Sequence, residues 1–119
     1  MIKRTFGLSN AQRRFYEQYA HENHVDLIEL CILDILQSAG GKLTWIMLQE
    51  ALPFPRTRLH QTAQRLSMQD LIRMDYDRLW LSDFAPFVID DVLTDLHAKY
   101  KESTGFEPGF DEELKIYNA

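Results

Sequence analysis

The sequence predicts a mainly α-helical domain that carries one short β-hairpin. Two observations lead to this fold class. Apolar residues recur at helical spacing in four segments before residue 69 and in a long segment after residue 82. Between them, residues 71–81 alternate between apolar and polar positions, which is typical of strands. With 119 residues, 45% hydrophobic and 26% charged, the chain fits one folded domain and not a disordered one.

Two helices are expected in the first third of the chain, at residues 9–23 and 25–38. Ser9 and Gln12 have the spacing of a capping box at the start of the first. The second stops at two consecutive glycines, Gly40 and Gly41. Its polar residues cover about half of the circumference: Asp26, Glu29, Asp34, Gln37 and Ser38. The other half is apolar, so we expect the domain to be built around this helix.

Two short helices follow, separated by prolines. Thr44 is the expected N-cap of a helix that ends near residue 52. Pro53 and Pro55 prevent the helix from continuing, and a new helix begins at about residue 55 or 56 and runs to about residue 68. The inward face of this last helix is expected to consist of Leu59, Thr62, Ala63 and Leu66.

A hairpin and a long helix complete the chain. Residues 71–76 and 79–81 are the expected strands, with a tight turn at Asp77-Arg78. Two short helices and a hairpin in this order describe a winged helix-turn-helix. The prediction is therefore a single domain over residues 1–119: an N-terminal helix at 9–23, a winged helix-turn-helix core at 25–82, a C-terminal helix at 83–102, and a tail at 103–119 with a short helical turn at 111–117.

The net charge of −5 is unevenly distributed. Residues 1–82 carry ten Lys/Arg and nine Asp/Glu, a balance of +1, and residues 83–119 carry three and nine, a balance of −6. The first two thirds are therefore free to form a basic face. The one cysteine, Cys31, lies in an apolar run and is expected in the core, with no intramolecular disulfide. No signal peptide or membrane-spanning run is visible, so we expect a cytoplasmic protein without a membrane partner.

The segment between Pro53 and Gln69 contains three arginines and no acidic residue. Arginine can pair with guanine and glutamine with adenine, and a helix N-terminus favours phosphate. The predicted DNA-contacting residues are Arg56, Thr57, Arg58, His60, Gln61, Gln64 and Arg65, with backbone contacts from Lys42, Arg73 and Arg78. The alternative interpretation is a merely solvated polar face.

The segment from Leu66 to Ser82 resembles the MarR-type winged-helix regulators. A leucine, four intervening residues and Leu71-Ile72 open the wing, and Trp80-Leu81-Ser82 close it before a long amphipathic helix. The resemblance covers residues 25–100 and implies a transcription regulator that binds duplex DNA. Two features depart from the family pattern. Asp70 stands where glycine is frequent in a left-handed turn, and the short wing lacks a glycine and contains two acids.

The outer helices carry apolar stripes that predict an interface. In the MarR-type family the terminal helices form the dimer, which implies a symmetric homodimer with N- and C-terminal dimerisation helices here. The expected interface residues are Phe15, Tyr16, Tyr19, Val88, Val92, Leu96 and Tyr100. The alternative is that these helices fold back onto their own core. A small-molecule effector would bind in the crevice between these helices and the DNA-binding lobe, although no residue identifies one.

Other chemistry is not indicated. A cluster of His21, Glu22, His24 and Asp26 resembles a metal site, but a solvated helix end is the favoured interpretation. His97 on the last helix is a further candidate ligand across a dimer. No motif indicates an enzyme or a cofactor. The second function class that stays open is a winged-helix module for protein–protein interaction, which the acidic composition and the two wing acids favour.

Overall fold

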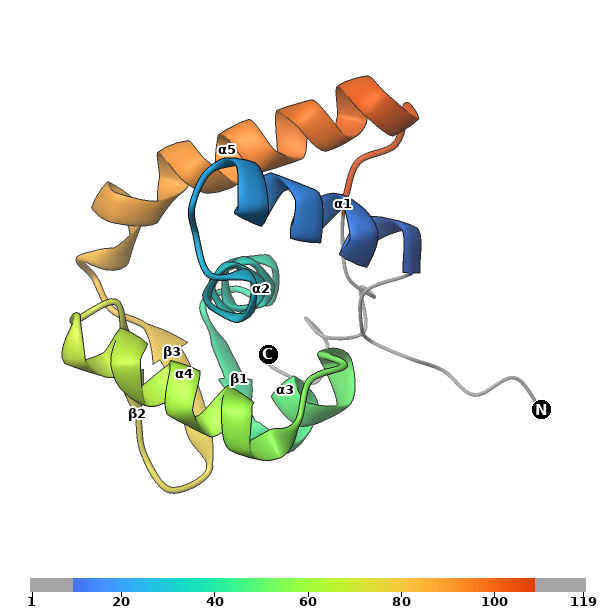
Figure 1. The fold of residues 1–119 in the computed structure, drawn as a ribbon. Coiled ribbons are helices and arrows are strands. Elements are labelled where there is room, and N and C mark those ends of the chain that lie inside the picture. The colour runs from blue at the N-terminus through green and yellow to red at the C-terminus, as the bar shows by residue number, and fades with distance from the viewer. Residues whose placement is uncertain (1–9, 109–119) are drawn as a thin grey trace.

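The computed structural model describes residues 10–108, which form five helices and a small three-stranded antiparallel sheet (Figure 1). The elements are α1 (Asn10–Glu22), α2 (Leu27–Ser38), β1 (Lys42–Thr44), α3 (Trp45–Ala51), α4 (Arg56–Met68), β2 (Ile72–Met74), β3 (Arg78–Leu81) and α5 (Ala85–Thr104). The predicted mainly helical class is confirmed, and the arrangement is compatible with a winged helical fold. The predicted cap at Ser9 and the terminal turn at 111–117 lie outside the described residues.

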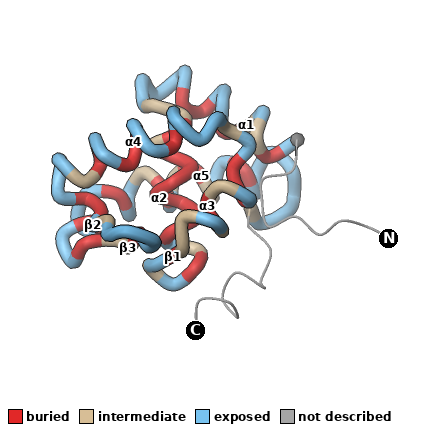
Figure 2. Tube along the Cα trace, turned by 90° about the horizontal axis from the view of Figure 1, so that it is seen from below, coloured by how far each residue is buried: buried red, intermediate tan, exposed pale blue. Residues whose placement is uncertain are grey.

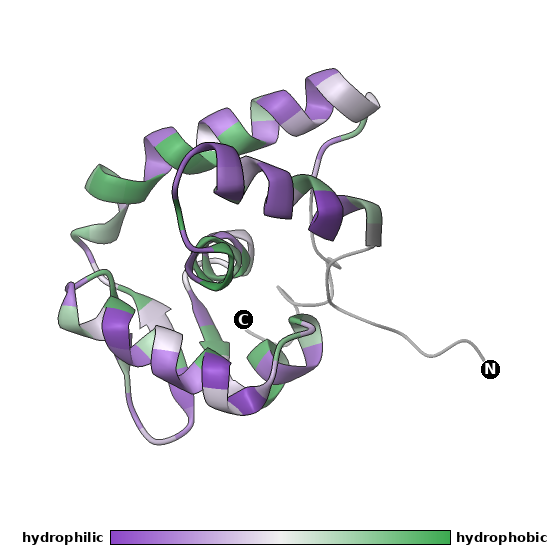
Figure 3. Ribbon diagram, in the orientation of Figure 1, coloured by the Kyte–Doolittle hydropathy of each residue, from purple (hydrophilic) through white to green (hydrophobic). Residues whose placement is uncertain are grey.

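Helix α2 is the centre of the molecule. Figure 1 shows it end-on between a layer of α1 and α5 and a layer of α3, α4 and the sheet. It contacts α1, α4, β1 and β3. Eight of its twelve residues are buried, and it is the apolar, interior helix in Figures 2 and 3. The exposed face of α2 is therefore narrower than the half of the circumference that the sequence predicts. Asp34, which is predicted on that face, is only 1% exposed.

The two ends of α2 are set by side-chain capping and by glycine. Asp26 is the N-cap, because its Oδ1 accepts a hydrogen bond from the Glu29 amide at 3.0 Å, so the helix begins at Leu27 and not at residue 25. At the other end Gly40 and Gly41 have φ values of +88° and +101°, which favour glycine. They turn the chain directly into β1.

The sheet has a strand that the sequence did not predict. β1 pairs antiparallel with β3, and β3 pairs with β2, in the order β1-β3-β2. Leu43 and Leu79 face the core, and side chains alternate along strands, so Lys42 and Trp80 face outward. The expected two-stranded hairpin is thus part of a three-stranded sheet, and β1 was missed because three residues carry no readable alternation.

The segments around α3 and α4 fold largely as predicted. Thr44 caps α3, since its Oγ1 accepts from the Met47 amide at 3.2 Å. The inward face of α4 is confirmed by the buried side chains Leu59, Thr62, Ala63 and Leu66. Asp70 has φ +59°, the left-handed conformation in which the family pattern has glycine, and the Leu71 amide donates to the Leu66 carbonyl at 3.0 Å.

Helices α1 and α5 pack on their own chain, which corrects four predicted interface residues. Tyr16, Tyr19, Leu96 and Tyr100 are at most 8% exposed within one chain. The Tyr19 hydroxyl donates to Asp95 at 2.8 Å, and burial together with this hydrogen bond raises the pKa of Tyr19 to about 12. These side chains are occupied by intramolecular packing. Of the other three, Val88 is exposed and Phe15 and Val92 are half-buried.

A buried polar network joins α1, α2 and α5. The Tyr16 hydroxyl donates to Asp34 at 2.5 Å, and His97 Nε2 lies 2.7 Å from the other oxygen of the same carboxylate. Gln12 Nε2 donates to the Tyr16 hydroxyl at 3.3 Å. The hydrogen bond to Asp34 raises the pKa of His97, and burial raises the pKa of Tyr16. The network joins α5 to α1 and α2, and the Asp34–His97 contact spans 63 residues of the sequence.

Candidate nucleic-acid interface

The outward side of α4 is a polar surface along the whole helix. Thr57, Gln61, Gln64 and Met68 follow one another at spacings of four, three and four residues, which places them on one line, and all four are exposed. Arginines and a histidine flank this line. The exposed flanking residues are Arg56 and His60 on one side and Arg58 and Arg65 on the other. Seven predicted DNA-contacting residues therefore share one helix surface.

The start of α4 favours an anion. Pro55 occupies the N-cap position and makes no side-chain capping hydrogen bond, so no side chain of the described residues takes up the amides of the first turn. Arg56 and Arg58 stand at this positive end of the helix dipole. Neither forms an ion pair with another residue of the 10–108 segment. Two cations and the free amides are thus available to a negatively charged partner.

Arg65 differs from the other two arginines. Its guanidinium lies 3.5 Å from Asp26 and 3.6 Å from Glu29, both at the start of α2. Its side chain is 54% exposed, so the contacts are those of a surface ion pair. The segment between Pro53 and Gln69 contains no acid of its own, but two acids from α2 reach Arg65 in three dimensions.

A groove runs along the other flank of α4. It has a volume of about 530 Å³ and is lined by Trp45, Gln49, Arg56, Thr57, His60, Gln61 and Tyr76. The rings of Trp45 and His60 are 5.4 Å apart, and Tyr76 is fully exposed. Trp45, Gln49 and Tyr76 were not predicted to belong to this surface. They reach it only because α3 and the β2–β3 turn pack beside α4, which no local pattern indicates.

The β2–β3 turn is held close to α3. Asp75 Oδ1 accepts hydrogen bonds from the amides of Asp77 and Arg78, each at 3.1 Å, and the Asp77 carbonyl accepts from the Trp45 amide at 2.9 Å. The turn thus covers residues 75–78, and the predicted two-residue turn at Asp77-Arg78 is corrected, because β3 already begins at Arg78. Asp75 acts here as a turn-forming residue.

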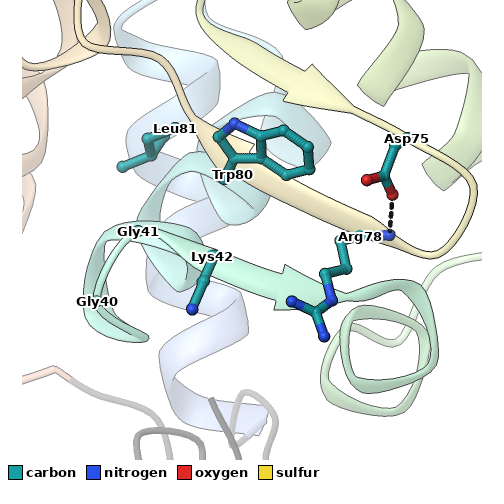
Figure 4. A pocket seen from close by; sticks show the side chains of 7 residues that line it. All are labelled: Gly40, Gly41, Lys42, Asp75, Arg78, Trp80 and Leu81. Atoms are coloured by element: carbon teal, nitrogen blue, oxygen red, sulfur yellow. Dashed lines mark hydrogen bonds between the residues drawn. The ribbon is translucent and has the colours of Figure 1, made fainter. Parts of the chain in front are cut away.

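Lys42 and Arg78 are not brought together with the α4 residues. They line a separate hollow on the outward side of the sheet, beside Trp80 (Figure 4). His21 and His24, from the cluster that resembled a metal site, are exposed. His97 contacts Asp34, and within residues 10–108 no group of three or more His, Cys, Asp or Glu residues is placed to hold a metal ion.

None of the helices in residues 10–108 combines the length and the apolar character needed to cross a bilayer. Comparison of the chain with protein-family models, curated proteins and solved structures found no match. Function is therefore inferred from the residues and their geometry.

Proposed function

We propose that this chain is a winged helix-turn-helix protein that binds duplex DNA as a MarR-like transcription regulator. One observation carries the proposal. The outward surface of α4 exposes Arg56 and Arg58, which form no ion pair within residues 10–108, at a helix end whose amides have no side-chain cap among these residues. The order of α3, α4 and the β2–β3 wing supports the assignment, because the second of two such helices is the one that enters the major groove.

The residues divide into two roles under this proposal. Arg56, Arg58 and the first-turn amides of α4 bind phosphates and fix the position of the helix. Gln61 and Gln64, in the middle of the exposed line, read base edges, since a side-chain amide pairs with adenine in the major groove. Tyr76 in the wing contacts the backbone beside the groove. Arg65 contributes less, because Asp26 and Glu29 already neutralise part of its charge.

The proposed regulator acts as a homodimer through the start of α5, with a contact that retains Val88 and Val92 from the interface expected from the sequence. The start of α5 exposes Phe84, Phe87 and Val88, at 53%, 86% and 46%. Of these three, Val88 also lines an apolar hollow of about 150 Å³ between α2 and α5, together with Leu33 and Val92. Exposed apolar patches of this kind are typical of interfaces. A two-fold contact there would present two copies of α4 to successive half-sites.

A salt titration of duplex binding tests the proposal. Binding of the full chain to a random duplex should weaken steeply as salt rises, and Arg58→Ala should reduce the slope of log K against log salt by about 0.9. Arg14→Ala, an exposed arginine on α1, is the matched control and should leave the slope unchanged. Arg65→Ala should change the slope less than Arg58→Ala does. Absence of duplex binding at low salt would overturn the proposal.

The second candidate function is protein–protein interaction. Ile46 is 67% exposed on α3. Tyr76 is fully exposed in the wing, where Asp75 and Asp77 are also exposed. Tyrosine is enriched in protein interfaces, and the two carboxylates repel phosphates. This function would be favoured if the chain bound no duplex and Ile46→Lys left its oligomeric state unchanged.

A further inference from the structure

The outward side of the sheet is a second cationic surface, built around Trp80. The register pairs Trp80 of β3 with Lys42 of β1 on one side and with Arg73 of β2 on the other. Directly paired residues point to the same side of a sheet. Arg78 precedes Trp80 by two residues and also points outward. One tryptophan therefore stands in the centre of the sheet with three cations around it.

These cations are available. Lys42, Arg73 and Arg78 are exposed, and none forms an ion pair with another residue of the described part of the chain. Asp75 is the one carboxylate among the residues that line the hollow of about 470 Å³. Its Oδ1 already accepts two backbone hydrogen bonds. Lys42 and Arg78 against this one carboxylate give the hollow a net charge of +1, which favours phosphates. Arg73 lines a different hollow, together with Asp70 and Asp83.

The indole of Trp80 is accessible to a stacking partner. Trp80 is only partly buried, and Figure 4 shows its ring face-on over β3, with Lys42 and Arg78 beside it. Among the described residues no cation lies over this ring; the two such contacts involve Arg13 with Phe54 and Lys99 with Tyr19. The ring is thus partly exposed, and phosphate-binding groups lie near it.

We infer that this sheet surface binds single-stranded nucleic acid, with a base stacked on Trp80 and phosphates held by Lys42, Arg73 and Arg78. A flat platform with an aromatic ring between cations is the arrangement that binds unpaired bases, whose faces are hidden in a duplex. The surface shares no residue with the outward side of α4. The inference therefore does not depend on the proposed duplex binding.

Fluorescence of Trp80 provides the first test. The chain has two tryptophans, so Trp45→Phe leaves Trp80 as the only indole. Titration with a thymidine oligonucleotide of roughly eight residues should quench its emission strongly. Inorganic polyphosphate carries the charges without bases and should quench it less. Equal quenching by both probes would overturn the stacking, and no response to either would overturn the site.

A pair of variants then separates this surface from α4. In anisotropy measurements with a labelled oligonucleotide, Trp80→Leu should weaken single-strand binding by roughly 5- to 150-fold and leave duplex binding unchanged. Arg58→Ala should have the opposite pattern. Unchanged single-strand affinity in a natively folded Trp80→Leu protein would refute the inference. So would a parallel loss of duplex affinity, which would assign the surface to the duplex. If the unmodified protein bound the single strand but no duplex, only the proposed function would be refuted.

A variant that keeps the Trp80 side chain tests the inference even if Trp80→Leu does not fold. Lys42→Ala combined with Arg73→Ala keeps the indole and removes two of the three cations. The slope of log K against log salt for the oligonucleotide should fall from about 2 to below 1, at about 0.7 per cation on a single strand. The exposed Arg14→Ala serves as the control. An unchanged slope in the double variant would refute the inference.

Discussion

Replacement of Asp34 by asparagine should destabilise the fold in a way that depends on pH. The carboxylate is 1% exposed and holds Tyr16 at 2.5 Å and His97 at 2.7 Å. A hydrogen bond to a charged group contributes about 1.5–3 kcal/mol and a neutral one about 0.5–1.5 kcal/mol. Loss of the charge with the shape kept therefore removes about 1 kcal/mol per bond, or about 2 kcal/mol of unfolding free energy. Asp34→Ala also leaves the buried Tyr16 O–H group without an acceptor and should cost about 3–5 kcal/mol.

The pH dependence follows from His97. The hydrogen bond to Asp34 raises the pKa of His97 above its ordinary value near 6.5. A raised pKa means that the folded state holds its proton more tightly than the unfolded state does. The stabilisation is therefore complete below pH of about 6.5 and is lost as the pH rises through the higher folded pKa. Asp34→Asn should remove this dependence.

Urea unfolding followed by circular dichroism at several pH values between about 5.5 and 8.5 measures both effects, since this range spans the window around the ordinary pKa of histidine. Asp91→Asn is the matched control, because Asp91 is an exposed acid on α5 and its replacement should change the unfolding free energy by less than about 0.5 kcal/mol. The reasoning is refuted if Asp34→Asn unfolds at the same urea concentration as the unmodified chain, or if the unmodified chain shows no loss of stability toward alkaline pH.

Three further expectations concern local features of the fold. Asp70→Gly should raise the unfolding free energy by about 0.5–1 kcal/mol, because φ is +59° and glycine tolerates that conformation; a lower melting temperature would contradict this. Thr44→Ala should lower the free energy of unfolding by about 1 kcal/mol, because the α3 cap is lost. In the same melting experiment, Thr44→Ser should retain most of the stabilisation that the cap provides. Cys31 is fully buried and burial raises the pKa of its thiol, so a thiol reagent should label it only at the rate of unfolding; rapid labelling without denaturant would rule this out.

Local sequence signals were sufficient for most of the elements. The cap at Thr44, the break at the prolines and the inward face of α4 depend on neighbouring residues, and all were predictable. β1 was not, since three residues cannot show a period. The polarity of Asp34 predicts a surface position, because its two partners, the buried Tyr16 and the partly buried His97, come from α1 and α5, 18 and 63 positions away.

The part of the candidate site that lies on α4 was predictable from the sequence, and the part that other elements bring beside α4 was not. The composition of the helix identified Arg56, Arg58, Gln61 and Gln64, which are all exposed. The neutralisation of Arg65 by α2 acids and the groove beside Tyr76 depend on how separate elements meet. The apolar stripes of the outer helices were read as an interface because their periodicity is the same whether they pack on a partner or on their own chain.

The shared position of α2 determines how this domain can be divided. Both layers bury their apolar side chains against the same helix, so neither layer keeps a core without it. A fragment limited to α3, α4 and the hairpin would expose Leu59 and Leu66 to water, and grafting it onto another scaffold would require a replacement for α2. Fusion partners are better attached outside α1 and α5, where the chain can be extended without separating the two layers.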